Sequence, residues 1–484
     1  MSARLSRLLH LFHRWLGIGA GLLVLGWFVS GLVMLYSPFP HLTVEERVQH
    51  LEVLHGEAVR ISPAEAAAQC PGAPRGARLA MLAGRPVYHF SGGKPACSVW
   101  ADNGRWVGLV SAEMAHEAAR RFLPGVALAE PDRIERDQWS VYSSYNAHRP
   151  LYRIAADDAA GTVLYVSSKS GEVLADTNRR ERLLGWLGSV PHWIYFTPLR
   201  GDDLGTWRVL VLWLPPIALL TAVAGLALGI QRLRVRRRYP RGQITPYHGW
   251  KRWHHLAGLA VGGFAVTWLL SGWLSNHPFG LLEMSSPPPG SAQRLAGGPF
   301  HPSSNIDLLR RQLAQVPDAR EAEWYRFGGR DYLEVRTPAG PRRFDGQGHT
   351  AAPIDVATLA AAIEAIEQMP VARAELIDHE DLYHYGRNSP AVLPAVRIRL
   401  ADAQDTTWYL DPATGRILQR IDDANRWHRW VFNALHRLDF PPLASLAGLR
   451  EGLITLLGLL GAGLAGSGCV IGWRRLFRRS RPSA

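Results

Sequence analysis

The sequence has few cysteines and lacks the short motifs that mark several common cofactor sites. Three cysteines among 484 residues exclude a fold built on disulfide bonds. Cys-x-x-Cys-His, the attachment motif of c-type haem, does not occur. A Walker loop and a Gly-x-Gly-x-x-Gly following a strand are also missing, so no nucleotide site is indicated.

Acidic residues are missing from three segments that together hold 16 of the 54 basic residues, namely 1–14, 232–254 and 474–484. The rest of the chain has 38 basic and 41 acidic residues, so the net charge of +13 comes from these segments alone. Each of them adjoins a long apolar run, which is the pattern of the positive-inside rule. The charge therefore indicates membrane topology and speaks against nucleic acid as a partner.

Four apolar runs are long enough to cross a bilayer, for which about 20 residues are needed. They are residues 15–36, 207–230, 255–275 and 452–473. The first run is too long for a signal peptide and has no small-x-small cleavage site after it, so we expect an uncleaved anchor. With the basic segments in the cytoplasm, the long loops lie outside, in a bacterial periplasm.

The predicted organisation alternates spans with large external domains. It consists of an N-terminus with the first span (1–36), periplasmic domain 1 (37–205), the second span (206–231), a cytoplasmic loop (232–253), the third span (254–275), periplasmic domain 2 (276–450), the fourth span (451–473) and a cytoplasmic tail (474–484).

The two halves of the chain repeat each other. At an offset of 241, Trp27, Ser30 and Gly31 match Trp268, Ser271 and Gly272, and His13 matches His254. At an offset of 244, His192 matches His436. We therefore predict an α-helical membrane protein whose four transmembrane helices form two tandem pseudo-twofold repeats, each with an α+β external domain.

Within the external loops, Ser62 to Glu65 forms a capping box, and a helix is expected over 112–122. Alternating strand-like pieces such as 151–154 and 396–400 follow. Helices over 179–194 and 423–438 are expected to carry the second pair of matched histidines toward the membrane.

Two cysteines, Cys70 and Cys97, lie in the first external loop, where an oxidising compartment would permit a disulfide. Their pairing stays open at this stage. Cys469 lies inside the last span and is expected to be an apolar filler.

The matched histidines are the candidate site residues. Ionisable side chains in or beside spans are functional candidates, and neutral imidazole is a common axial ligand of haem iron. In both repeats the first histidine is followed by glycines four and eight residues later, which either leave room for a flat macrocycle or serve close helix packing. The hypothesis is that His13 and His254 hold one haem b near the cytoplasmic face, and His192 and His436 a second near the outer face.

Four further histidines are possible substitutes as ligands. His10 lies one turn before His13, and His255 adjoins His254 but points about 100° around the helix. His277 lies at the outer end of the third span, and His428 lies eight residues before His436. Neither has a matched histidine in the first repeat.

Several of these segments together resemble the PepSY-associated transmembrane proteins. They are His13-Arg-Trp-Leu-Gly17 with Ser30-Gly31, Arg149-Pro-Leu-Tyr-Arg153, Gly171 to Asp176, Pro191 to Arg200 and Leu435 to Phe440. The resemblance covers nearly the whole chain and implies four spans, PepSY-like periplasmic domains and histidine-ligated b-type haem. That family includes iron-regulated inner-membrane proteins, among them ferric-siderophore reductases. His255 and the His277-Pro-Phe sequence depart from its pattern.

The expected function is that of an inner-membrane oxidoreductase which takes electrons from a quinol or a cytoplasmic reductase and reduces a periplasmic ferric chelate, such as a ferric siderophore. The alternative is a non-enzymatic PepSY protein that binds or regulates a periplasmic partner. A metal or siderophore permease is a third reading, which the lack of carboxylates within the spans disfavours.

Overall fold

A computed structural model describes residues 3–92, 97–201, 204–303, 305–386, 390–444 and 446–477. The chain divides into two compact units. The helical unit comprises residues 1–39, 183–284 and 424–484, and the sheet unit comprises residues 40–182 and 285–423.

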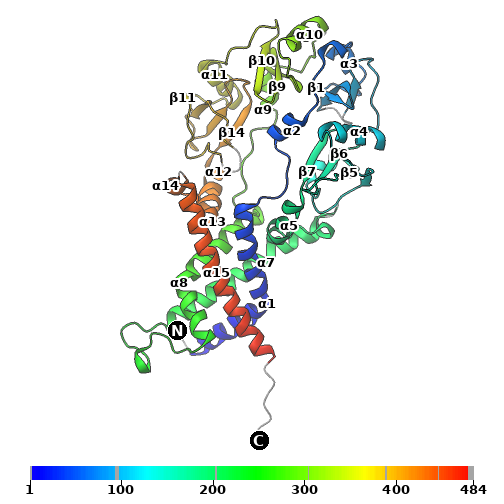
Figure 1. The fold of residues 1–484 in the computed structure, drawn as a ribbon. Helices are drawn as coiled ribbons and strands as arrows, with labels where there is room; N and C mark the ends of the chain where they lie inside the picture. The colour runs from blue at the N-terminus through cyan, green and yellow to red at the C-terminus, as the bar shows by residue number, and fades with distance from the viewer. Residues whose placement is uncertain are drawn as a thin grey trace. The chain divides into compact units, whose positions relative to one another are not determined.

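Four long helices form the bundle of the helical unit (Figure 1): α1 (Ala3–Tyr36), α7 (Gly205–Arg232), α8 (Trp250–Leu274) and α15 (Ala447–Leu476). Each overlaps one predicted span and is long and apolar enough to cross a membrane, which confirms four candidate transmembrane helices. Large apolar side chains point outward from the bundle, as at Leu22, whose exposure is 74%. Such a surface suits lipid rather than water.

The four helices close a ring. Contacts join α1 to α7, α7 to α8, α8 to α15 and α15 back to α1, so α1 and α8 lie diagonally opposite each other. The start of α1, the loop from α7 to α8 and the end of α15 lie at the same end of the bundle (Figure 1). We call this the basic end, because the arginine-rich segments that the structure describes lie there.

Short helical segments gather at the opposite end of the bundle. The helix predicted over 179–194 is broken at Gly188 (φ −107°, ψ −97°) into α5 (Arg179–Leu187) and α6 (Ser189–Trp193). The helix predicted over 423–438 consists of α12 (Asp423–His428), a π-helical stretch η6 (Arg429–Ala434) and α13 (Leu435–Arg437). The other short elements at this end are η3 (Thr197–Leu199), η5 (Pro278–Gly280) and α14 (Pro441–Ala444), whereas η4 (Pro240–Gly242) lies in the loop from α7 to α8 at the basic end.

The sheet unit contains a six-stranded antiparallel sheet to which each of the two long loops contributes three strands. The strand order is β10-β9-β8-β1-β2-β3. The loops join at the β1–β8 pair, where Arg78 lies opposite Glu323. The strands are β1 (Gly76–Leu82), β2 (Arg85–Ser91), β3 (Cys97–Trp100), β8 (Glu321–Phe327), β9 (Arg330–Thr337) and β10 (Gly340–Asp345). The two loops, each of which was assigned a domain of its own from the sequence, thus share one sheet.

Helices from both loops bury apolar side chains against this sheet. Ala66 of α3 (Pro63–Ala67) and Leu309 and Leu313 of α10 (Ile306–Ala314) belong to the same core cluster as Leu79 of β1. The predicted capping box is confirmed, because Ser62 and Glu65 cap the start of α3 reciprocally.

Two four-stranded antiparallel sheets complete the sheet unit, one from each loop. In the first, α4 (Ala112–Phe122), which matches its predicted bounds, packs on β4 (Asp132–Ile134), β5 (Leu151–Ala155), β6 (Val163–Ser167) and β7 (Val173–Thr177). In the second, α11 (Val356–Glu367) packs on β11 (Val371–Ile377), β12 (Ala395–Leu400), β13 (Thr407–Leu410) and β14 (Ile417–Ile421). The remaining short elements of the sheet unit are α2 (Val44–His50), η1 (Gly56–Ala58), η2 (Ser143–His148) and α9 (Ser291–Ala296). The expectation that the long loops form α+β structure is therefore confirmed.

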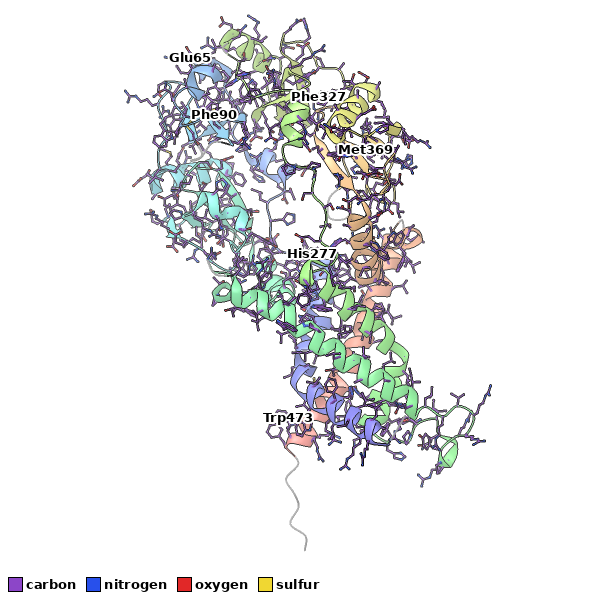
Figure 2. All side chains as sticks on the ribbon, turned by 180° about the vertical axis from the view of Figure 1, so that it is seen from behind. Glu65, Phe90, His277, Phe327, Met369 and Trp473 are labelled. Carbon is purple, nitrogen blue, oxygen red and sulfur yellow. A yellow bond between two sulfur atoms is a disulfide. The ribbon has the colours of Figure 1, made fainter. Side chains whose placement is uncertain are left out.

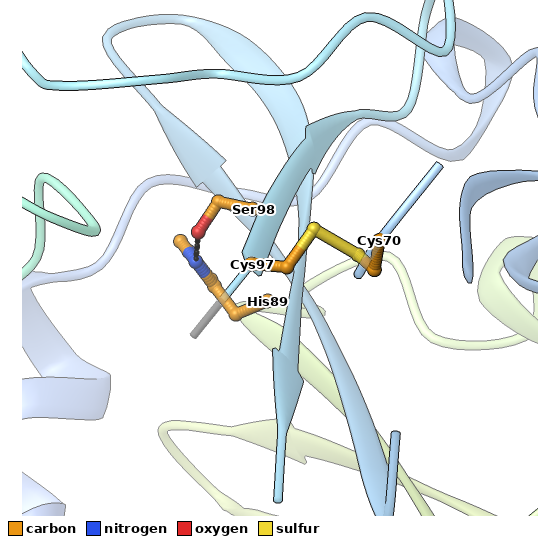
Figure 3. The surroundings of a disulfide bond; sticks show 4 residues. All are labelled: Cys70, His89, Cys97 and Ser98. Atoms are coloured by element: carbon orange, nitrogen blue, oxygen red, sulfur yellow. Dashed lines mark hydrogen bonds between the residues drawn. A yellow bond between two sulfur atoms is a disulfide. The ribbon is translucent and has the colours of Figure 1, made fainter. Parts of the chain in front are cut away.

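A disulfide joins Cys70, which follows α3, to Cys97 at the start of β3 (Figure 3). The Cα atoms lie 5.8 Å apart. His89 on the adjacent β2 strand is buried and lies with Nδ1 2.9 Å from Ser98 Oγ. The sequence left this pairing open, and the structure decides it.

A buried carboxylate links the two loops beside the β1–β8 pair. The Glu321 side chain is fully buried and accepts hydrogen bonds from Arg47 (2.8 Å), Arg78 (2.5 Å) and Arg336 (2.9 Å). Arg78 also pairs with Glu172 at 2.5 Å. Burial alone would raise the pKa of Glu321, but Arg78 and Arg47 outweigh burial and lower that pKa to about 2.

We expect Glu321 to make the stability of the sheet unit depend on pH. Because its folded-state pKa lies below its ordinary value of about 4.3, its contribution is complete above that pH and is lost as the pH falls toward 2. Glu321→Gln should remove this dependence and cost about 3–5 kcal/mol at pH 7, since three arginines lose their counter-charge. Unfolding of the full chain, followed by tryptophan fluorescence between pH 2 and 7, measures both effects.

The matched control is Glu57→Gln, because that side chain is 84% exposed. It should change the free energy of unfolding by less than about 0.5 kcal/mol. Equal stability of the Glu321 and Glu57 variants at pH 7 would contradict the stabilising role assigned to Glu321.

Candidate functional site

The structure brings His13 and His254 together inside the bundle. His13 lies on α1 and His254 on α8, and their ring centroids are 6.1 Å apart with planes inclined by 35°. Because α1 and α8 are diagonal members of the ring of helices, the two imidazoles meet across its centre.

The Nδ1 atom of each of these imidazoles is bonded to the neighbouring helix of the bundle. His13 Nδ1 lies 2.9 Å from the carbonyl oxygen of Thr221 on α7. His254 Nδ1 lies 3.2 Å from the carbonyl oxygen of Leu464 and 2.9 Å from Ser467 Oγ, both on α15. A carbonyl oxygen only accepts, so Nδ1 carries the proton and Nε2 keeps its lone pair.

His192 and His436 form a second pair at the opposite end of the bundle. Their ring centroids are 6.5 Å apart with planes inclined by 66°. His192 lies on α6 beside α1, and His436 lies on α13 beside α8. Burial lowers the pKa of both imidazoles, and for His436 the neighbouring His192 lowers it further. Both rings are therefore neutral at pH 7, as a metal ligand must be.

The second pair is anchored through the same atoms as the first. His192 Nδ1 lies 3.1 Å from Ser30 Oγ on α1 and also bonds to the backbone of Trp27. His436 Nδ1 lies 3.2 Å from Ser271 Oγ and 3.1 Å from the carbonyl oxygen of Trp268 on α8. Among the described residues, no hydrogen bond reaches Nε2 of any of the four rings. All four rings therefore offer an unprotonated Nε2.

Each ring lies against a glycine of a neighbouring helix. A Cβ atom at Gly225 would lie 2.5 Å from Cε1 of His13, and one at Gly468 would lie 3.2 Å from Cε1 of His254. The corresponding distances are 3.2 Å from Gly31 to His192 and 3.0 Å from Gly272 to His436. These glycines allow the approach that lets each Nδ1 reach its partner.

The glycines that follow the first histidines in the sequence have a different role. A Cβ atom at Gly21 would meet Cys469 Sγ at 3.3 Å, and one at Gly262 would meet Leu226 Cδ1 at 3.3 Å. They permit close helix packing, which was one of the two readings of the sequence. Of the glycines under the rings, Gly31 and Gly272 were recognised in the sequence only as matched positions of the repeat, and Gly225 and Gly468 were not recognised.

The two pairs lie near opposite ends of the bundle. His13 to Gly31 on α1 and His254 to Gly272 on α8 each span 18 residues, about 27 Å of helix at 1.5 Å per residue. The hydrocarbon core of a bilayer is about 30 Å thick. One pair therefore lies toward each side of a membrane that the bundle spans.

The spacing within each pair fits a single metal centre between the rings. Imidazole nitrogen binds a first-row metal ion at about 2 Å, and the ring centre lies about 1.1 Å behind it. Two rings on opposite sides of one ion then have centres about 6.3 Å apart. The observed distances of 6.1 and 6.5 Å agree with this value. Two neutral imidazoles, as in each pair, are donors of the kind that the iron of haem b takes.

Aromatic side chains lie between the pairs. Trp268 contacts Phe264 at 4.2 Å, Phe28 at 5.6 Å and His436 at 6.1 Å between ring centroids. Its Nε1 is buried and has no hydrogen-bond partner among the described residues. This indole thus leaves one donor available to a group bound beside His436.

The other candidate histidines are placed differently. Both nitrogens of buried His255 are used, Nδ1 with Thr245 Oγ1 at 2.8 Å and Nε2 with the Gly229 carbonyl oxygen at 2.9 Å, which leaves none for a ligand. His10 bonds to the Ser6 carbonyl oxygen within its own helix. In the described part of the chain, no group of three or more His, Cys, Asp or Glu side chains is arranged to hold a metal ion.

Comparison with known proteins identifies one family. The family described as "PepSY-associated TM region" matches residues 11–475. No curated protein matches the sequence. The match covers both histidine pairs and the sheet unit.

Gly225 provides a test of how the His13 ring is held. Gly225→Ala should displace the ring, break its bond to Thr221 and destabilise the helical unit by about 1–3 kcal/mol. The control Gly263→Ala on α8 has nothing within 4 Å and should stabilise by up to about 1 kcal/mol. Thermal unfolding in detergent compares the two variants, and equal midpoints would contradict the role given to Gly225.

Proposed function

The chain belongs to the PepSY-associated TM region family of membrane proteins, and from this we propose that it is an oxidoreductase with two haem b groups that moves electrons across the inner membrane to a periplasmic ferric chelate. The observation that carries the proposal is the occurrence of two facing imidazole pairs, each at a spacing suited to one iron ion, at the two ends of one bundle. Bound haem would supply reversible one-electron chemistry at its iron.

The chain's own residues would bind and orient the two groups. His13 and His254 supply Nε2 atoms at the basic end, and His192 and His436 supply them at the opposite end. A hydrogen bond from Nδ1–H to a carbonyl oxygen fixes the ring orientation and raises the basicity of the ligand. The apolar bundle keeps water and its protons away from the iron sites.

We also propose that the helical unit is a tandem repeat. Ser30 with His192 and Ser271 with His436 make the same contact, at 3.1 and 3.2 Å, and Gly31 and Gly272 lie under the same rings. These contacts follow the sequence offsets of 241 and 244. They support a pseudo-twofold axis along the membrane normal.

The proposed orientation places the basic end of the bundle in the cytoplasm and the sheet unit in the periplasm. The arginines at the basic end support the first assignment by the positive-inside rule. The disulfide between Cys70 and Cys97 in the sheet unit supports the second, since such bonds persist in oxidising compartments.

On this orientation, electrons enter near His13 and His254 from a quinol or a cytoplasmic reductase and leave near His192 and His436. Each ferric ion that accepts one electron becomes ferrous and is then released more readily by a chelator with hard oxygen donors. A ferric siderophore is such a chelate.

The purified protein should contain two bis-histidine haems per chain, counted as pyridine haemochrome. His13→Ala or His254→Ala should each remove one haem, and His192→Ala or His436→Ala should each remove the other, because a single imidazole remains at the affected pair. His10→Ala is the matched control, since its ring bonds within its own helix and should leave two haems.

A protein without a Soret band, or with the same haem content in all four alanine variants, would overturn the proposal. It would favour the alternative function, a PepSY protein that binds a periplasmic partner.

Protein reduced with dithionite should be reoxidised by a ferric hydroxamate chelate in the absence of oxygen, with one ferrous ion formed per electron. His436→Ala should slow this reaction at least about tenfold, because its pair is the one proposed to lie on the periplasmic side. Stopped-flow absorbance, with a ferrous-specific dye in parallel, measures both quantities. Reduced protein that stays reduced in the presence of the chelate would contradict reductase activity.

A further inference from the structure

A third pair of histidines lies at the end of the bundle opposite the basic end. His277 follows α8, and His428 is the last residue of α12. Their ring centroids are 5.7 Å apart and their planes are inclined by only 24°. Figure 2 labels His277 at this end of the helical unit and Trp473 at the other. Both rings are half-buried.

His277 is held in an unusual conformation with one nitrogen free. Its φ of 50° and ψ of 50° place it in the left-handed region, which costs a residue with a Cβ atom about 1–2 kcal/mol. Its Nδ1 donates to the carbonyl oxygen of Leu282 at 2.9 Å, so Nε2 keeps its lone pair. No hydrogen bond to the His428 ring is found among the described residues. Strain of this kind in a non-glycine residue is typical of functional positions.

This pair differs from the two pairs assigned to haem. Neither ring lies against a glycine among the described residues, whereas all four proposed haem ligands do. Two imidazoles on one ion have ring centres about 6.3 Å apart when they lie on opposite sides and about 5.1 Å apart at a tetrahedral angle. The distance of 5.7 Å lies between these values, so an ion shared by the rings would lie off the line between them.

We propose that His277 and His428 bind a divalent first-row transition-metal ion, with water completing the coordination. Imidazole suits ions of this class, whereas the harder ferric ion favours the oxygen donors of a chelate. The existence of the site does not depend on the proposed function. Only the identity of its natural ion does, because reduction of a ferric chelate would produce ferrous iron.

An aromatic stack connects this site to the His192–His436 pair. His428 and Phe432 have ring centroids 5.4 Å apart, and Phe432 stacks on His436 at 5.2 Å with planes inclined by 26°. The π-helical stretch η6 brings the three rings, which are four residues apart, onto one face. Such π-helical turns are frequent at functional sites. The bound ion would thus lie one aromatic ring away from His436.

The test uses the untagged, full-length protein after treatment with a chelator, and Ni²⁺ as a probe that the haem groups do not reduce. Isothermal titration should detect one Ni²⁺ per chain. His428→Ala and His277→Asn should each weaken this binding by about tenfold or more. Asn is chosen at position 277 because it tolerates the left-handed backbone better than Ala.

His379→Ala is the matched control, since that ring is 76% exposed and lies in the sheet unit, and it should leave the affinity unchanged. Equal Ni²⁺ affinity in the wild type and both variants would overturn the site, and so would the loss of one haem in either variant. Ni²⁺ binding by a protein without haem would sustain the site while the proposed function fails. Two haems per chain without Ni²⁺ binding would support the proposed function and overturn the metal site.

Discussion

The hydrogen bond from Nδ1 of a partly buried imidazole to a carbonyl oxygen or hydroxyl of a neighbouring helix is the interaction on which the helical unit depends. A polar ring inside an apolar bundle is costly unless its N–H is paired. The bond is possible only where a glycine lets the ring approach, as at Gly225 for His13 and Gly272 for His436. Once Nδ1 is committed, Nε2 is left without a hydrogen bond among the described residues. The same contacts therefore set both the packing of the helices and the orientation of the imidazoles that are proposed as ligands.

The sheet unit solves a different electrostatic problem. Its two halves come from loops far apart in the sequence and meet at β1 and β8, beside a carboxylate that no water reaches. Three arginines around Glu321 make this burial tolerable, and the low pKa of the carboxyl group is the consequence. The same arrangement ties segments before the second span to segments after the third. The two long loops thus form one sheet unit.

The helical spans and their histidines could be predicted because the signals are local or repeat along the chain. About 20 apolar residues define a span, and the repeat placed His13 with His254 and His192 with His436. The helix predicted over 179–194 is broken at Gly188. The helix predicted over 423–438 is continuous to Arg437 but contains a π-helical stretch from Arg429 to Ala434, which the sequence did not indicate. Trp268 and the third pair, His277 with His428, could be recognised as candidate site residues only from the side chains that surround them in the structure.

The sequence by itself determined the membrane character of the protein, its four spans, the segregation of positive charge and the candidate imidazoles, because hydropathy and charge act along the chain. Only the tertiary structure decided the Cys70–Cys97 bond, the sheet shared by both loops and the exclusion of His255. These outcomes depend on which atoms meet in space. His254 and His255 adjoin in sequence, but a rotation of about 100° turns one toward His13 and the other into two hydrogen bonds with Thr245 and Gly229.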